Sequence, residues 1–210
     1  QLIVAEGYMD VIALSEAGFA ASVAPLGTAV TENQLALLWR ITDEPIIALD
    51  GDTAGLRAAM RLVDLALPLL QSGKSLRFAI MPEGQDPDDL IRASGASAVQ
   101  NVIDGAIPMV QLLWRRETEG RNFDSPERKA ALDKTLRQKI MLITDPSIRS
   151  HYGQAIKDLR WDLFRPQAKA RNSGGFTPGG GKRGGGWKAP AEGAMPTTQS
   201  SFLVSSERAA

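Results

Sequence analysis

Cysteine is absent from the 210-residue chain and histidine occurs only once. The absence of cysteine excludes disulfides, zinc fingers and thiol catalysis within this sequence. It also fits a reducing cytosol, although it does not prove one. Any metal site that this chain forms is therefore expected to depend on oxygen ligands.

Net charge is missing too, because 24 lysine and arginine residues balance 24 aspartate and glutamate residues. A neutral chain has no general basic field that attracts nucleic acid. Contact with a polynucleotide would have to come from local charge, from metal ions, or from parts of a longer protein. The 43% of hydrophobic and 23% of charged residues are ordinary for a soluble globular protein.

Long apolar runs are absent as well, since none approaches the roughly 20 residues that span a bilayer. The first residues also lack the basic start and the apolar stretch of a signal peptide. We therefore expect no membrane partner. The chain opens with Gln1 and runs at once into a strand-like segment at residues 2–5, so we expect it to be a fragment of a longer protein.

What the first 82 residues do contain is an alternation of short apolar runs with helical patterns, which is typical of parallel β/α units. The predicted strands are residues 2–5, 20–24, 46–49 and 76–81. The fold class expected is α/β, with a central parallel four-stranded sheet flanked by helices.

Helices are predicted between these strands and after them. Thr31 and Gln34 form a capping box at the start of one helix, and residues 53–71 form another that bends at Pro68. Later, Ser125 and Asp145 each precede a proline, which is a start signal for a helix. Four apolar residues share one further predicted helical face: Ile107, Val110, Leu113 and Trp114.

Composition divides the chain into three parts. Residues 1–95 carry the β/α pattern, and residues 96–165 are predicted to form a helical subdomain. Residues 166–210 are rich in glycine and proline and are predicted to be a flexible linker. The basic residues of this last part are interpreted as solubilising, with weak tethering to DNA as the alternative.

Acidic residues follow three of the four predicted strands, and they are Glu6, Asp10, Asp50, Asp52, Asp86 and Asp88. The carboxyl ends of parallel strands meet at one edge of a sheet, so we expect these side chains to converge there. Unpartnered carboxylates repel one another, and a hard divalent cation would relieve that repulsion. Oxygen ligands favour Mg²⁺ or Mn²⁺ over zinc or copper.

Helix capping is the alternative explanation for each cluster taken alone, because acidic residues often stabilise helix N-termini. Asp52, directly before Thr53, has the position of such a cap. The coincidence of three clusters after three strands is what favours a metal site.

A glutamate after the first strand and a D-x-D after the third resemble the Toprim pattern. Four segments are similar to bacterial DNA primases in particular: V-A-E-G-Y-M-D-V-I-A-L (4–14), A-P-L-G-T-A-V-T (24–31), A-L-D-G-D-T-A-G-L-R-A-A (48–59) and L-R-F-A-I-M-P-E-G-Q-D-P-D-D-L-I-R (76–92). The resemblance covers roughly residues 1–165 and weakens after about residue 95.

The resemblance implies a Toprim fold over residues 1–95 and a metal-dependent nucleotidyltransferase. This enzyme would make short RNA primers from ribonucleoside triphosphates on a single-stranded DNA template during replication. Glu6, Asp50 and Asp52 match the catalytic magnesium ligands. The outer acidic positions of the same metal site match Asp10, Asp86 and Asp88.

The resemblance also implies parts that lie outside this chain. Zinc is expected only in an N-terminal domain before Gln1, together with the basic half of the polymerase core. The replicative helicase is expected to bind through a C-terminal domain after Ala210. The chain alone is expected to be inactive and monomeric, and the intact protein to work in the bacterial cytoplasm at the replication fork.

Two other Toprim classes remain as alternatives, and one detail stays open. A recombination-mediator-type DNA-binding module would usually carry a zinc-binding cysteine cluster, which is absent. A topoisomerase would need a nucleophilic tyrosine in a DNA-gate domain, and neither Tyr8 nor Tyr152 has such a setting. Arg57 and Arg61, on the helix after D-G-D, either face phosphates or are solvated helix charges.

Overall fold

The computed structural model describes residues 1–25 and 29–165. These residues belong to one structural unit. The predicted linker at 166–210 lies outside the described residues. Within the described ranges, no helix combines the length and the apolar character needed to cross a membrane.

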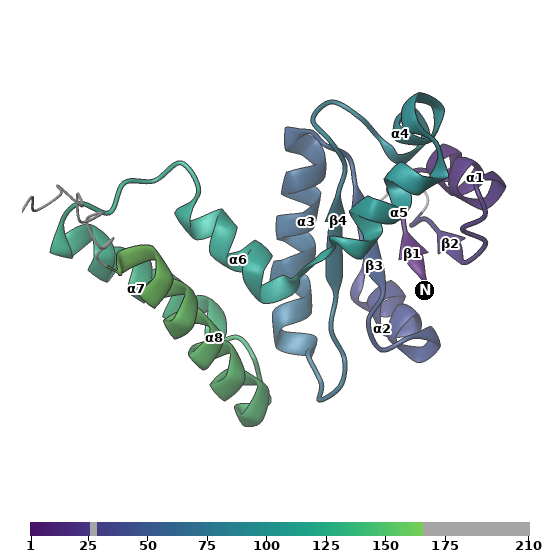
Figure 1. Ribbon diagram of the computed structural model, residues 1–210. Helices are drawn as coiled ribbons and strands as arrows, with labels where there is room; N and C mark the ends of the chain where they lie inside the picture. Colours follow the sequence, from purple (N-terminus) through teal and green to yellow (C-terminus); the bar gives the residue numbers. More distant parts are fainter. Residues whose placement is uncertain (26–28, 166–210) are drawn as a thin grey trace, which may run out of the picture. The chain divides into compact units, whose positions relative to one another are not determined.

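The centre of the unit is a five-stranded sheet with the strand order β2-β1-β3-β4-β5 (Figure 1). The strands are β1 (Ile3–Val4), β2 (Ser22–Val23), β3 (Ile46–Leu49), β4 (Arg77–Ile80) and β5 (Ile107–Pro108). The first four strands run parallel, which confirms the predicted parallel arrangement. The short β5 adds to β4 in the antiparallel direction.

The described residues form eight α-helices and one short 3-10 helix. They are α1 (Tyr8–Glu16), α2 (Glu32–Ile41), α3 (Thr53–Ala66), η1 (Leu67–Leu69), α4 (Pro87–Ser94), α5 (Ala96–Asp104), α6 (Met109–Thr118), α7 (Pro126–Ile140) and α8 (Pro146–Phe164). The predicted caps are present: Thr31 and Gln34 form a capping box, and Ser125 and Asp145 cap α7 and α8.

Two sequence predictions need correction. The sheet has five strands instead of four, because Ile107 lies in β5 and not on a helical face. Pro108 explains the difference, since a residue before proline is pushed towards extended backbone and the helix starts only at Met109. The helix predicted to bend at Pro68 ends at Ala66 and continues as η1.

Both faces of the sheet are covered, and the alternation of side chains along β3 sends apolar groups to each face. Ile47 and Leu49 belong to a core formed with α2, α3 and α6. Ile46 and Ala48 face the opposite core, which includes residues of α1, α4 and α5 (Figure 1). A strand buried on both faces reads as a continuous apolar run, as β3 does.

The first core continues without a break into α7 and α8. Leu132, Leu136 and Ile156 of these two helices are buried in the same cluster as Leu113 of α6. Helices α7 and α8 pack on α6, and α6 packs on α3. The sheet and these helices therefore share one apolar core.

Candidate active site

The carboxyl ends of three neighbouring strands carry the predicted acidic residues. Strands β1, β3 and β4 lie side by side in the sheet. Glu6 follows β1, Asp50 and Asp52 follow β3, and Asp86 follows β4 as the N-cap residue of α4. Asp10 lies in the first turn of α1, and Asp88 in the first turn of α4. The structure thus brings the six carboxylates to one edge of the sheet, the carboxylate edge.

Of the six carboxylates, Asp50 has the most strongly raised pKa. Burial and the negative charges of Glu6, Asp10, Asp86 and Asp52, in that order, raise the pKa of Asp50 from 3.8 to about 7. Its Oδ1 atom is buried and has no hydrogen-bond partner within the described residues. In the absence of a cation, burial and the neighbouring charges therefore favour the protonated form of Asp50 far more than in an ordinary aspartate.

Glu6 faces the same surroundings from β1. Burial raises the pKa of Glu6 above its ordinary value, and the charges of Asp52 and Asp10 add to this effect. The backbone N–H of Asp50 and the charge of Arg61 act in the opposite direction and lower the pKa. The Oε1 atom of Glu6 is also buried without a hydrogen-bond partner in the described part of the chain.

Asp10 is almost fully buried, with 7% of its surface exposed. Its Oδ2 atom accepts a hydrogen bond of 3.1 Å from the backbone N–H of Gly7, which orients the carboxylate towards the loop after β1. Burial is the main cause that raises the pKa of Asp10, and the charges of Asp86 and Asp88 contribute. Asp10 is thus electrostatically coupled to the carboxylates after β4.

Helix capping, the alternative explanation from the sequence, is present at three of the six positions, since Asp10 accepts from the backbone N–H of the N-cap residue of α1. Asp52 Oδ1 accepts a hydrogen bond of 2.7 Å from the backbone N–H of Gly55. Asp86 Oδ1 accepts one of 2.7 Å from the backbone N–H of Asp89. Each cap uses one carboxylate oxygen and fixes the side chain, which leaves the second oxygen available. Capping and ligand binding are therefore compatible here.

A close backbone contact joins the loops after β3 and β4. The N–H of Gly51 donates to the carbonyl of Gln85 at 2.9 Å, and the N–H of Gly84 donates to the carbonyl of Gly51 at 3.0 Å. A Cβ atom at Gly51 would lie 1.8 Å from the carbonyl oxygen of Pro82, so only glycine fits. This contact holds the D-G-D loop against the loop that carries Asp86.

The donor set fits a hard cation. Two buried carboxylate oxygens without partners and three raised pKa values describe a site whose charges are uncompensated. Only oxygen donors are available, which favours Mg²⁺ or Mn²⁺. Within the described ranges, however, no group of three or more acidic or histidine side chains is already gathered as closely as a metal site requires.

The raised pKa of Asp50 has a consequence for stability in the absence of divalent cations. A carboxyl with a raised pKa in the folded state stabilises the fold fully below its unfolded pKa, and this contribution is lost as the pH rises through about 7. We therefore expect the free energy of unfolding to fall as the pH rises from about 4 to about 7. Denaturant titrations in a chelator test this.

Asp50→Asn is the matched variant for that measurement, since it keeps the shape and removes the titration. Its free energy of unfolding is expected to depend less steeply on pH than that of the unmodified chain. Equal slopes for the two proteins would show that Asp50 is not strongly perturbed in the folded state.

Comparison with known families gives two matches along the chain. A Toprim domain model matches residues 1–79. A model described as the DnaB-helicase binding domain of primase matches residues 113–159. The second match lies in the region of α6 to α8, whereas the sequence interpretation placed the helicase-binding part after Ala210.

Curated relatives are DNA primases. The primase of Rickettsia typhi is 45% identical over 159 residues, which are 76% of this chain and 27% of the relative. The primase of Neisseria meningitidis serogroup A is 37% identical over 160 residues, which are 76% of this chain and 27% of the relative. The chain therefore spans about a quarter of the length of these relatives.

Solved structures of primases share the fold. A DNA primase domain from Pseudomonas aeruginosa is 36% identical, with a TM-score of 0.70, over 75% of this chain and 50% of that one. A DnaG primase catalytic domain bound to single-stranded DNA is 34% identical, with a TM-score of 0.68, over 75% of this chain and 51% of that one. By its fold, its motifs and these relatives, the chain belongs to the bacterial DNA primase family.

Proposed function

We propose that this chain is the Toprim-containing part of a primase that makes short RNA primers on single-stranded DNA. The reaction is templated nucleotidyl transfer, with ribonucleoside triphosphates as substrates. The observation that carries the proposal is the carboxylate edge, where Glu6 and Asp50 each hold a buried oxygen without a partner in the described residues. The likeness to a primase catalytic domain bound to single-stranded DNA supports the template.

Mg²⁺ or Mn²⁺ is the proposed cofactor, held by Glu6, Asp50 and Asp52. The outer acidic positions are Asp10, Asp86 and Asp88. A bound divalent cation would supply positive charge to the triphosphate and lower the pKa of the attacking hydroxyl.

The chain's own residues hold the carboxylates in place for this role. The backbone N–H of Gly55 fixes Asp52, and the contact between Gly51 and the loop after β4 holds Asp50 next to Asp86. One oxygen of Glu6 and one of Asp50 are buried without a hydrogen-bond partner in the described residues, which leaves both open to a cation.

The rest of the reaction requires parts outside this chain. Nucleotidyl transfer needs a template and a nucleotide in the correct positions, and a neutral chain supplies no general basic surface for them. We therefore expect residues 1–210 to be inactive alone, and zinc to be needed only in the preceding part of the intact protein. The replicative helicase is the further proposed partner, and the family match over residues 113–159 supports it. We further propose that the intact protein is a monomer and that it works at the bacterial replication fork.

Calorimetric titration with Mn²⁺ tests the metal site without requiring activity. The unmodified chain is expected to bind Mn²⁺, and Asp50→Ala is expected to bind it at least about tenfold more weakly, because a direct ligand is lost. Glu16→Ala is the control, since Glu16 is an exposed carboxylate at the far end of α1. Identical titrations for Asp50→Ala and Glu16→Ala would refute the metal assignment.

A further inference from the structure

Positive charge is scarce around the carboxylate edge. Arg92 lies near it but is paired with Asp88, with Nη2 2.6 Å from Oδ2. Arg61 of α3 also lies near the edge, and its charge lowers the pKa of Glu6. Within residues 1–25 and 29–165, Arg61 forms no ion pair and no hydrogen bond, so its five N–H donors are free for a ligand.

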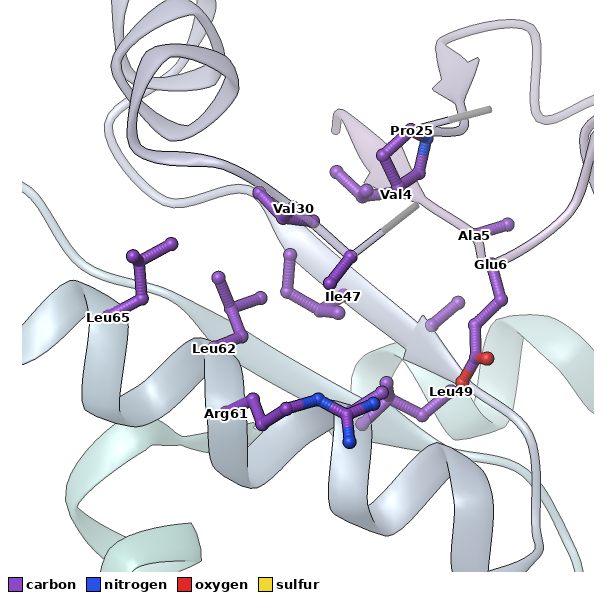
Figure 2. A pocket seen from close by; sticks show the side chains of 13 residues that line it. Val4, Ala5, Glu6, Pro25, Val30, Ile47, Leu49, Arg61, Leu62 and Leu65 are labelled. Atoms are coloured by element: carbon purple, nitrogen blue, oxygen red, sulfur yellow. The ribbon is translucent and has the colours of Figure 1, made fainter. Parts of the chain in front are cut away.

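Arg61 is exposed, and its position on α3 places it beside a cavity next to the sheet. Ala58, Arg61, Leu62 and Leu65 lie three and four residues apart, so they share one face of the helix. This face lines a cavity of about 420 Å³ together with residues of β1 and β3, and Glu6 lines the same cavity. Figure 2 shows the guanidinium of Arg61 reaching along the cavity towards the carboxylate of Glu6.

The aliphatic stem and the guanidinium of Arg61 have different neighbours. Leu62 and Leu49, both buried, form apolar walls of the cavity beside its aliphatic stem. The charged end lies beyond these walls, on the side of Glu6. A long basic side chain commonly packs its stem on apolar surface in this way and keeps its charge in water.

A guanidinium that stays unpaired next to several carboxylates is suited to bind an anion that shares the site with them. Its planar donors match two phosphate oxygens at once, which a lysine ammonium cannot do with the same geometry. Phosphate is also the group that the carboxylates themselves repel.

We propose that Arg61 binds a phosphate group of the polymerase substrates at the Glu6 end of the carboxylate edge. The inference rests on the proposed function and adds to it a residue that contacts the substrate. Two sources present the same chemistry: the triphosphate of the incoming ribonucleotide and the backbone of the single-stranded template. Arg61 serves one of these phosphates, and Arg57 does not.

Arg57 provides the matched control because, like Arg61, it is an exposed arginine of α3, and it lies one turn earlier. It does not line the cavity that contains Arg61 and Glu6. Removing either arginine lowers the net charge by the same amount. A difference between Arg57→Ala and Arg61→Ala therefore reports position and not overall charge.

Binding is measured on the 210-residue chain with Mn²⁺, using two probes: a non-hydrolysable ribonucleoside triphosphate and a single-stranded DNA oligonucleotide. Arg61→Ala is expected to bind one of the two probes at least about tenfold more weakly, on the scale of losing a charge-assisted hydrogen-bond pair. Arg61→Lys is expected to recover part of the affinity, and Arg57→Ala to match the unmodified chain. The probe for which the affinity falls identifies the source of the phosphate.

The same variants in a full-length primase extend the test to conditions where both substrates are bound. Arg61→Ala is expected to raise the KM for nucleotide or for template at least about tenfold, whereas Arg57→Ala leaves both unchanged. Unchanged KM values in Arg61→Ala, or equal effects of the two arginine variants, would overturn the inference.

Binding of Mn²⁺ alone separates this inference from the proposed function. Arg61→Ala is expected to bind Mn²⁺ as the unmodified chain does, since no metal ligand has been changed. If the unmodified chain itself fails to bind Mn²⁺, the metal site is refuted. If Mn²⁺ binds normally but phosphate binding does not depend on Arg61, only the role of Arg61 is refuted.

Discussion

A full-length primase with Asp50→Ala is expected to synthesise primers at least about 100-fold more slowly than the unmodified enzyme, as when one preorganised electrostatic stabiliser is removed. Asp50 lies at the carboxylate edge, and its pKa is the most strongly raised of the carboxylates there. Asp52→Ala and Glu6→Gln are expected to be comparably severe. The measurement is incorporation of labelled ribonucleotides on single-stranded DNA with Mg²⁺.

The physical reason also predicts what these variants leave intact. Asp50 is held in unfavourable surroundings, since burial and four neighbouring charges oppose its ionised form. Replacing it removes repulsion, so the variant is expected to unfold at the same temperature as the unmodified protein or a higher one in a chelator. Loss of synthesis without loss of stability would then point to a missing ligand and not to a damaged fold.

Glu16→Ala in the same full-length protein is the control for general effects of removing a carboxylate. It is expected to synthesise primers normally, because Glu16 is exposed and lies outside the carboxylate edge. Near-normal synthesis by Asp50→Ala would defeat the metal-site assignment and, with it, the proposed mechanism.

Much of the fold could be predicted from the sequence because its signals are local. The strand at 46–49 was predicted with the bounds that β3 has, since a buried strand is a continuous apolar run between turns. The caps of α2, α7 and α8 were also predicted, because the capping side chains lie within three residues of the helix start. The short antiparallel strand β5 was missed, because two residues carry no periodicity.

The placement of the acidic residues was predictable for a related reason. Once the strands are known, the carboxyl end of each one fixes where Glu6, Asp50 and Asp86 lie. The electrostatic state of these groups was not predictable, because the pKa of Asp50 depends on burial and on charges from other strands. The sequence also left open whether Arg57 and Arg61 face phosphates or are solvated helix charges, because only the folded helix shows that Arg61, and not Arg57, lines the cavity.

The contact at Gly51 also emerged only in three dimensions, and it supports the second large effect that we expect. Gly51→Ala places a Cβ atom 1.8 Å from the carbonyl oxygen of Pro82, where neither backbone segment is free to yield. Relieving this overlap requires the loops after β3 and β4 to separate. Overpacking of this kind costs on the order of 3 kcal/mol, which for a domain of this size lowers the melting temperature by about 6–12 °C.

Gly153→Ala is the matched control, because it makes the same chemical change in the interior of α8, where nothing lies within 4 Å of the added atom. Alanine is favoured over glycine inside a helix by about 1 kcal/mol, so this variant is expected to be neutral or more stable. Thermal unfolding of the two variants followed by circular dichroism makes the comparison. Equal melting temperatures would show that the two loops adapt to the added atom without cost.

The same substitution links the fold to the site. The hydrogen bonds from Gly51 to Gln85 and from Gly84 to Gly51 hold the loop of Asp50 beside the loop of Asp86. When these loops separate, the charge of Asp86 moves away from Asp50, and the two carboxylates would no longer lie close enough to share the proposed cation. Gly51→Ala is therefore expected to bind Mn²⁺ more weakly even at temperatures where it is fully folded, although it removes no carboxylate. Normal Mn²⁺ binding by folded Gly51→Ala would mean that the spacing of the two loops does not control the metal site.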